Sequence, residues 1–201
     1  MMNGSRSRVA AFTVVELMIV VALVAIIITL AAPSLRDMIL LQRLRGVNAQ
    51  VVADLTFARS EAVSRGTFVQ VKFRGTSGPA GMTCYTIYAR ENNLSSPQCD
   101  CTAAAGSRCT DASLTEIRTV QVPSSESVRV VHLSTDWDHF TISPRTGGIS
   151  QTEADLSNQP LLVFLISTSI DSARRFNDYF GVSGRTGYCV PAGSTLAGEP
   201  C

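Results

Sequence analysis

The sequence has almost no net charge and lacks the usual signatures of an enzyme. Its 17 Lys and Arg residues are balanced by 16 Asp and Glu residues, so the overall charge gives no reason to expect binding to nucleic acid or to acidic lipid. No serine nucleophile elbow and no phosphate-binding loop stands out in the chain. We therefore predict no catalytic residues, no cofactor and no enzymatic activity. Any binding activity has to come from a local group of residues.

The N-terminus lacks the apolar centre of an ordinary secretory signal. Residues 1–11 are polar and basic, with Arg6 and Arg8, whereas residues 12–32 are apolar except for threonines and Glu16. About 20 apolar residues are enough to cross a bilayer core, and positive residues before such a segment stay in the cytoplasm. We expect residues 1–11 to be a leader and residues 12–32 to be a single transmembrane helix, with the rest of the chain exported.

Glu16 is a carboxylate inside the apolar run, where a charge costs about 3 kcal/mol and needs a partner. The order Ala11, Phe12, Thr13, Glu16 and Leu17 after a basic leader resembles the N-terminus of type IV pilins and pseudopilins. The resemblance implies that prepilin peptidase cuts between Ala11 and Phe12 and methylates the Phe12 amine. It also implies that the Glu16 carboxylate pairs with the N-terminal amine of a neighbouring subunit. The family usually has glycine in the place of Ala11. A plain signal anchor with an incidental acid is the alternative.

Residues 33–66 continue the helix with an amphipathic pattern. Pro33 is expected to bend the helix or to mark the membrane exit, and Gly66 to end it. Together with the apolar run this predicts a helix of roughly 50 residues, half in lipid and half docked on a soluble domain. Apolar residues recur at three- and four-residue steps, at Leu35, Met38, Leu41, Leu44, Val47, Val51, Leu55, Ala58 and Ala62. Most of the polar face is assigned to Arg36, Asp37, Arg43, Arg45, Gln50, Asp54 and Arg59.

Beyond Gly66 the pattern changes to that of short strands. Closely spaced strands after one long helix predict an α+β fold, with the helix packed on an antiparallel sheet in a β-rich head of residues 67–201. Residues 161–166 are continuously apolar and predict a buried central strand, while residues 75–114 are interpreted mainly as an insertion or loop. The candidate strands are residues 67–74, 83–90, 116–122, 127–133, 139–143, 161–168 and, more loosely, 174–182.

Within the pilins and pseudopilins, three later segments resemble one group in particular, the GspH/FimT minor pilins and minor pseudopilins. They are residues 55–66 followed by Val69 and Val71, residues 140–148 (FTISPRTGG), and Gly184-Arg185. The resemblance implies a pilin-like, non-enzymatic subunit, anchored in the bacterial inner membrane with its head in the periplasm, that takes part in assembly or priming of a type IV filament. Its expected partners are other pilin or pseudopilin subunits. A pseudopilin of a type II secretion system is the alternative, and genomic neighbours would separate the two.

A third hypothesis is DNA binding during natural transformation. Some related pilins bind DNA through a C-terminal glycine-arginine motif with a second arginine two residues on, and here Gly187 stands in that second place. Arg174, Arg175 and Arg185 still form a basic concentration near the C-terminus, and such residues can contact phosphates. A solvated loop is the preferred interpretation.

The helix end contains two alanines four residues apart, Ala58 and Ala62. Small residues at this spacing are typical of close packing of a helix on a sheet, so we expect the neighbouring Arg59 and Glu61 to point away from that face.

All six cysteines follow the apolar run, where an oxidising compartment favours pairing. We expect a Cys189 to Cys201 disulfide to hold the tail of residues 190–200 near Arg185, with Cys84, Cys99, Cys101 and Cys109 pairing among themselves. A metal site of Cys99, Cys101 and Cys109 with His132 or His139 is disfavoured, because common zinc sites use paired C-x-x-C spacing.

Residues 136–139, Asp-Trp-Asp-His, are the one cluster with the composition of an acid–base or metal site. They lie in a short polar stretch between two candidate strands, where aspartates commonly form turns, and Trp137 is expected to cover the edge of the core.

Overall fold

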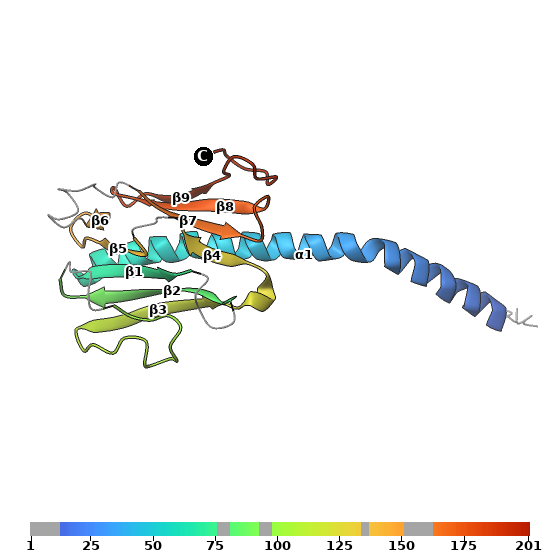
Figure 1. Cartoon of the computed structure of the whole chain (residues 1–201), viewed down its shortest axis with the longest axis horizontal. Helices are drawn as coiled ribbons and strands as arrows, with labels where there is room; N and C mark the ends of the chain where they lie inside the picture. The colour runs from blue at the N-terminus through green and yellow to red at the C-terminus, as the bar shows by residue number, and fades with distance from the viewer. Residues whose placement is uncertain (1–12, 76–80, 93–97, 134–136, 151–162) are drawn as a thin grey trace, which may run out of the picture. The chain divides into compact units, whose positions relative to one another are not determined.

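The computed structural model describes residues 13–75, 81–92, 98–133, 137–150 and 163–201, with the backbone alone for residues 30–33. Contacts divide the chain into two compact units, Met1–Ile39 and Leu40–Cys201. One helix, α1 (Val14–Arg65), supplies the described part of the first unit and continues into the second (Figure 1). The expected helix of about 50 residues is therefore present.

In the first unit, α1 begins at a threonine cap. The Glu16 backbone N–H donates to Thr13 Oγ1 at 3.2 Å, which satisfies one of the free N–H groups at a helix start. Large apolar side chains from Val14 to Ile28 are 46% to 72% exposed. No single described helix passes a test of length and hydropathy for crossing a membrane, but Val14–Thr29 and Ser34–Arg65 pass it as a bent pair.

In the second unit, α1 contributes one buried face to the core. Leu44, Val51, Leu55, Ala58 and Ala62 are at most 1% exposed, in agreement with the later part of the predicted apolar face. Its first two members, Leu35 and Met38, are 56% and 55% exposed. The helix ends at Arg65 because Gly66 takes a φ of +64°, the left-handed conformation that glycine adopts without steric cost.

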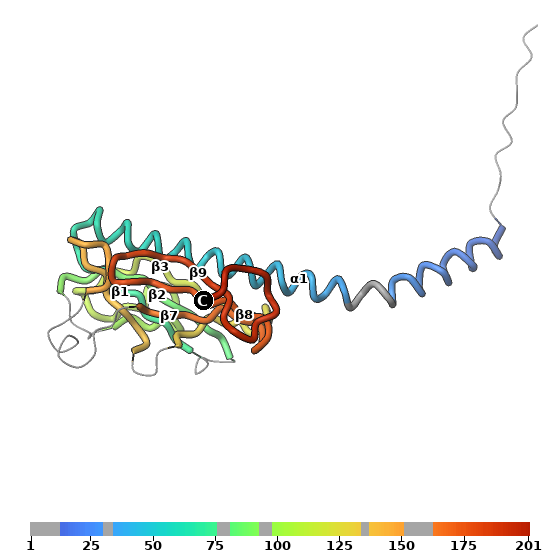
Figure 2. The backbone as a smooth tube through the Cα atoms, turned by 90° about the horizontal axis from the view of Figure 1, so that it is seen from above, coloured from blue at the N-terminus to red at the C-terminus, as the bar shows by residue number. Residues whose placement is uncertain are grey.

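The described residues of the head form two antiparallel sheets. Val130 N–H on β4 (Arg129–His132) donates to Thr83 Oγ1 on β2 (Thr83–Arg90) at 3.0 Å, and this hydrogen bond links the two sheets. The first sheet has the order β3 (Leu114–Val122), β2 (Thr83–Arg90), β1 (Phe68–Arg74), β5 (His139–Ile142), β6 (Ile149–Ser150). The second has the order β4 (Arg129–His132), β7 (Val163–Ser169), β8 (Arg175–Gly181), β9 (Thr186–Cys189), and a short 3-10 helix, η2 (Ser124–Glu126), precedes β4. In Figure 2, β9 runs close to α1, and the Thr56 and Thr186 hydroxyls lie 3.0 Å apart.

The observed strands match the candidates, with three corrections. Strands β6 and β9 were not predicted, because each has four residues or fewer and glycine is part of or next to both. Strand β2, at the position of the candidate 83–90, is buried along its whole length between β1 and β3, so residues 75–114 are not an insertion or loop throughout. Strand β7 is central, but Val163 and Leu165 are 45% and 39% exposed, so only one of its faces is buried there; residues 161 and 162 of this candidate lie outside the described residues.

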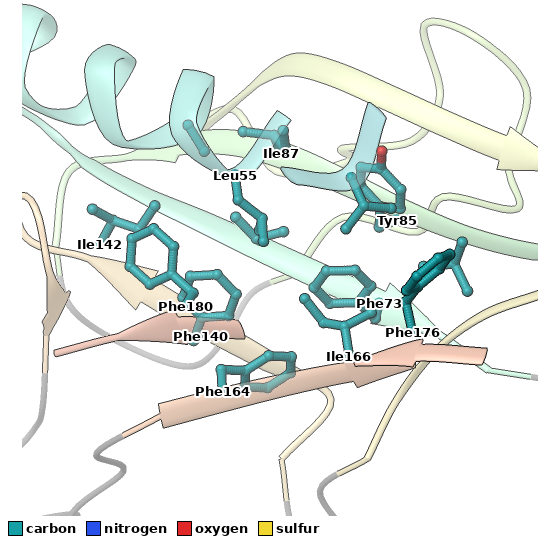
Figure 3. Close-up of a cluster of buried hydrophobic side chains, with 14 of the residues drawn as sticks. Leu55, Phe73, Tyr85, Ile87, Phe140, Ile142, Phe164, Ile166, Phe176 and Phe180 are labelled. Carbon is teal, nitrogen blue, oxygen red and sulfur yellow. The ribbon is translucent and has the colours of Figure 1, made fainter. Parts of the chain in front are cut away.

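Aromatic rings fill the middle of the core. The ring centroid of Phe140 lies 4.8 Å from those of both Phe164 and Phe180, and the Phe73 centroid lies 5.6 Å from that of Phe164. These rings come from both sheets, and Figure 3 shows them gathered beside Leu55 of the helix. Each such aromatic pair stabilises the fold by about 0.5 to 1.5 kcal/mol beyond the contribution of its buried area. The phenylalanines therefore join the two sheets into one core.

A buried acid fixes the helix to the first sheet. Asp54 is 1% exposed, which corrects its assignment to the polar face. Its carboxylate accepts a 2.7 Å hydrogen bond from the Tyr85 hydroxyl and a charged one from Arg118. Burial and the Asp54 carboxylate raise the pKa of Tyr85, which therefore remains a neutral donor. The Arg118 guanidinium also lies over the Phe57 ring, at 4.9 Å from its centroid.

A second buried acid has fewer partners. Asp178 on β8 is fully buried among core residues and accepts a 2.6 Å hydrogen bond from the Thr168 hydroxyl, while its other oxygen has no partner. Burial raises the pKa of Asp178 to about 7, because desolvation disfavours the charged form.

Candidate assembly surface and basic residues

The N-terminal site is described from Thr13 onward. Glu16 lies in the first turn of α1 and is exposed, with apolar side chains of the same helix around it that are exposed as well. Ala11 and Phe12, the predicted processing residues, lie outside the described residues. What the structure provides here is a helix surface with a carboxylate near its start and apolar side chains beyond it, a surface suited to burial in lipid or against other helices.

The segments that carried the GspH/FimT resemblance meet at one place in the head, which we call the glycine junction. It consists of Gly147 and Gly148 after β5, Gly184 between β8 and β9, and Arg59 of α1. A Cβ on Gly148 would overlap the Val182 carbonyl, and one on Gly184 would overlap the Gly147 carbonyl. The two turns thus touch backbone to backbone, which only glycine permits.

Arg59 holds this junction to the helix. Its Nη1 donates to the Gly184 carbonyl oxygen at 3.0 Å, and a Cβ on Gly147 or Gly184 would come within 2.9 Å or 2.8 Å of its Nε. The expectation that Arg59 simply points away from the sheets is wrong, because its long side chain reaches back over the two turns. Glu61 instead forms an ion pair with Arg65, one helical turn on. Sequence reasoning missed the contact, although all three segments had been singled out by resemblance.

The three arginines predicted as a basic concentration do not form one cluster. Arg174 and Arg175 lie at the start of β8, while Arg185 follows its end, in the turn to β9. A seven-residue strand spans about 20 Å. Arg174 pairs with Asp171, and Arg175 Nη2 donates to the Ala192 carbonyl at 3.1 Å. Residues close in sequence are separated here because an antiparallel hairpin places them at its opposite ends.

Three disulfides use all six cysteines: Cys84–Cys101, Cys99–Cys109 and Cys189–Cys201. The last is the pairing expected for the tail, and the other four cysteines pair among themselves as expected. In the described part of the chain, no group of three His, Cys, Asp or Glu side chains is arranged to hold a metal ion.

The tail of residues 190–200 does not lie where it was predicted to lie. Thr195 N–H donates to the Ala173 carbonyl at 2.7 Å, and the Ser194 hydroxyl donates to the Arg175 carbonyl at 3.0 Å. The tail thus lies against the start of β8 and not near Arg185. Cys189 sits at the end of β9 that pairs with Asn177, which carries the tail to that side.

The Asp-Trp-Asp-His cluster is an ion-pair network at the start of β5. His139 Nδ1 lies 2.7 Å from an Asp138 oxygen, and Lys72 Nζ lies 3.7 Å from the other. Partial burial works to raise the pKa of Asp138, but the hydrogen bond with His139 and the Lys72 charge hold it below its usual range. Trp137 packs against the core as predicted, and Asp136 lies outside the described residues. These contacts link strands and give the cluster a structural role.

Comparison with solved structures finds the type IV minor pilin FimU of Pseudomonas aeruginosa (strain PAO1) in two crystal forms. In space group P21 the identity is 14% and the TM-score 0.46, over 73% of this chain and 87% of that chain. In space group P65 the identity is 14% and the TM-score 0.43, over 72% of this chain and 90% of that chain. No curated protein matches the chain.

A family model described as Type II transport protein GspH matches residues 48–174. The match includes the helix end and the glycines after β5, and it excludes the N-terminal apolar run and Gly184-Arg185. It spans more than half of the chain and includes most of the head. The chain therefore belongs to the GspH family and is a minor pilin or pseudopilin of the GspH/FimT type.

Proposed function

We propose that the protein is a low-abundance subunit that takes part in assembly or priming of a type IV filament. In this proposal residues 12–32 anchor it in the inner membrane, and Leu40–Cys201 is the periplasmic head. The exposed apolar surface of α1 between Val14 and Ile28 carries the proposal. At about 25 cal/mol per Å² of apolar area removed from water, this surface favours a lipid environment first and the packed helices of a filament afterwards.

Glu16 would favour transfer of the helix from lipid into the filament. A carboxylate among apolar side chains is unfavourable in lipid, and a neighbouring subunit's N-terminal amine would pair with it by a charge-assisted hydrogen bond. Cleavage by prepilin peptidase between Ala11 and Phe12 would create that amine on each subunit. Intact-mass analysis tests this step, since the mature chain should begin at Phe12 and carry one methyl group.

A pseudopilin of a type II secretion system is the second candidate. The description of the matching family, Type II transport protein GspH, favours it. Deletion of the gene in its own host separates the two candidates: loss of surface filaments supports the first and loss of exported enzymes supports the second. The separation of Arg174 and Arg175 from Arg185 gives DNA binding no support.

The assembly role is tested by Glu16→Ala in the full-length chain. The variant should insert into the membrane at least as well as the parent, because a charge is removed from the apolar segment, and its amount in sheared filaments should fall. Asp37→Ala is the matched control, since Asp37 is an exposed carboxylate of the same helix outside residues 12–32. Normal incorporation of Glu16→Ala would refute the pairing role.

A further inference from the structure

A groove lies between α1 and the hairpin of β8 and β9, in the unit Leu40–Cys201. Its volume is about 530 Å³, within the range of sites that bind ligands or peptide side chains. The floor and walls are mainly apolar, and the tail closed by the Cys189–Cys201 disulfide contributes one wall through Ala197. The lining residues are Arg45, Asn48, Ala49, Val52, Ala53, Phe176, Tyr188 and Ala197.

Asn48 is the unusual member of this lining. Its side chain is only 4% exposed, and its Oδ1 has no hydrogen-bond partner. A buried acceptor without a partner is destabilising, and native structures retain few of them. The oxygen is buried, so an N–H group that entered the groove would satisfy it once the Asn48 amide turned toward the groove. The unpaired oxygen of Asn48 therefore indicates a ligand that supplies a hydrogen-bond donor.

The other groove residues define what surrounds that donor. Tyr188 is 50% exposed, with its ring edge-on to Phe176 at 5.5 Å, while Ala49 and Ala53 leave space on the helix side. An apolar side chain fits between these walls. Arg45 is exposed beside the groove and pairs with no carboxylate among the described residues. Tyrosine and arginine are, with tryptophan, the residue types enriched at the energetic centres of protein interfaces.

We propose that this groove binds an extended apolar segment with an acidic side chain, supplied by a neighbouring subunit of the filament. The segment's backbone N–H bonds to Asn48 Oδ1, an apolar side chain lies between Ala53 and Tyr188, and the carboxylate pairs with Arg45. An extended segment fits better than a helix, because the backbone N–H groups of a helix are free only in its first turn. The proposal rests on the proposed function, which supplies the neighbour.

Photo-crosslinking of the full-length chain in its own host tests the proposal. p-Benzoylphenylalanine replaces Tyr188, and a matched control places it at Arg129, an exposed residue of β4 at the other edge of the same sheet. Tyr188 should crosslink to a pilin-type subunit, at a peptide that contains Asp or Glu, and Arg129 should not. Equal crosslinking at the two positions, or a crosslinked peptide without an acidic residue, overturns the proposal.

Two groove variants sharpen the test. Asn48→Leu and Ala53→Trp should each lower the Tyr188 crosslink by about tenfold, the loss expected for one good hydrogen bond or for a filled groove. Asn48→Leu should also unfold at the same or a higher temperature than the parent, which excludes misfolding as the cause. Unchanged crosslinking in both variants overturns the proposal. If the chain co-purifies with filaments while Tyr188 gives no subunit crosslink, the groove proposal fails alone; if the chain is absent from filaments, the proposed function fails.

Discussion

Replacement of Asp178 by asparagine should stabilise the head in a pH-dependent way. The pKa of Asp178 rises from its ordinary value of 3.8 to about 7 through burial. Each unit of pKa is worth about 1.4 kcal/mol, so holding this carboxyl in the core costs about 4 kcal/mol once it must ionise. Asparagine keeps the shape and can still bond to Thr168, but it carries no charge at any pH.

The direction of the effect follows from proton binding. Because the folded pKa is raised, the folded state binds the proton more tightly than the unfolded state between about pH 4 and pH 7, so the parent loses stability as pH rises through that window. The difference between Asp178→Asn and the parent should therefore be smallest near pH 4 and should reach about 4 kcal/mol by pH 8.

Urea unfolding of the oxidised chain in detergent, followed by the fluorescence of the single tryptophan, measures this difference at pH 5 and pH 8. The control is Asp171→Asn: Asp171 is exposed, and its hydrogen bonds with Arg174 lower its pKa. It is ionised in both states above pH 5, so its difference should stay constant. An Asp178→Asn difference that is equal at pH 5 and pH 8 would refute the assignment of a neutral, desolvated carboxyl.

Two further predictions concern close backbone packing at glycine and the disulfide of the tail. Gly148→Ala should destabilise the head by about 1 to 3 kcal/mol through overpacking against the Val182 carbonyl, whereas Gly46→Ala, in an open part of α1, should stabilise it by up to about 1 kcal/mol; chemical denaturation decides whether the two signs differ. Replacing both Cys189 and Cys201 by alanine should cost about 3 kcal/mol and raise hydrogen exchange in residues 190–200 while the sheets stay protected; a global loss of protection would contradict this local role.

Local patterns predicted most of the fold. The apolar steps from Leu44 to Ala62 located the buried helix face. Alternation in Phe68–Arg74, and the tyrosine and β-branched residues of Thr83–Arg90, located two strands almost to the residue. Strand β9 was missed because Thr-Gly-Tyr-Cys has no alternation, and its place depends on pairing with β8. Short strands of this kind are specified by their neighbours and not by their own sequence.

The candidate site, too, could be predicted only in part from the sequence. The importance of residues 55–66, residues 140–148 and Gly184 could be recognised from the sequence, but their contact could not, since it joins segments 125 residues apart in the case of Arg59 and Gly184. Asp54 was assigned to solvent because a single acid beside Leu55 is indistinguishable from a polar-face residue. Only the hydroxyl of Tyr85 and the guanidinium of Arg118 make its burial possible.

The order of the cysteines along the chain has a consequence for how the protein matures. Cys84–Cys101 and Cys99–Cys109 cross in sequence, so a chain oxidised from its N-terminus onward would join Cys84 to Cys99 before Cys101 or Cys109 had emerged. That pairing leaves Cys101 for Cys109, and two disulfides must then be exchanged before the native connectivity forms. Uncatalysed exchange takes minutes to hours. For a chain that begins with the Cys84–Cys99 pair, we therefore expect a disulfide isomerase to speed the formation of the native pairs, whereas a chain oxidised only after Cys109 has emerged forms them without exchange.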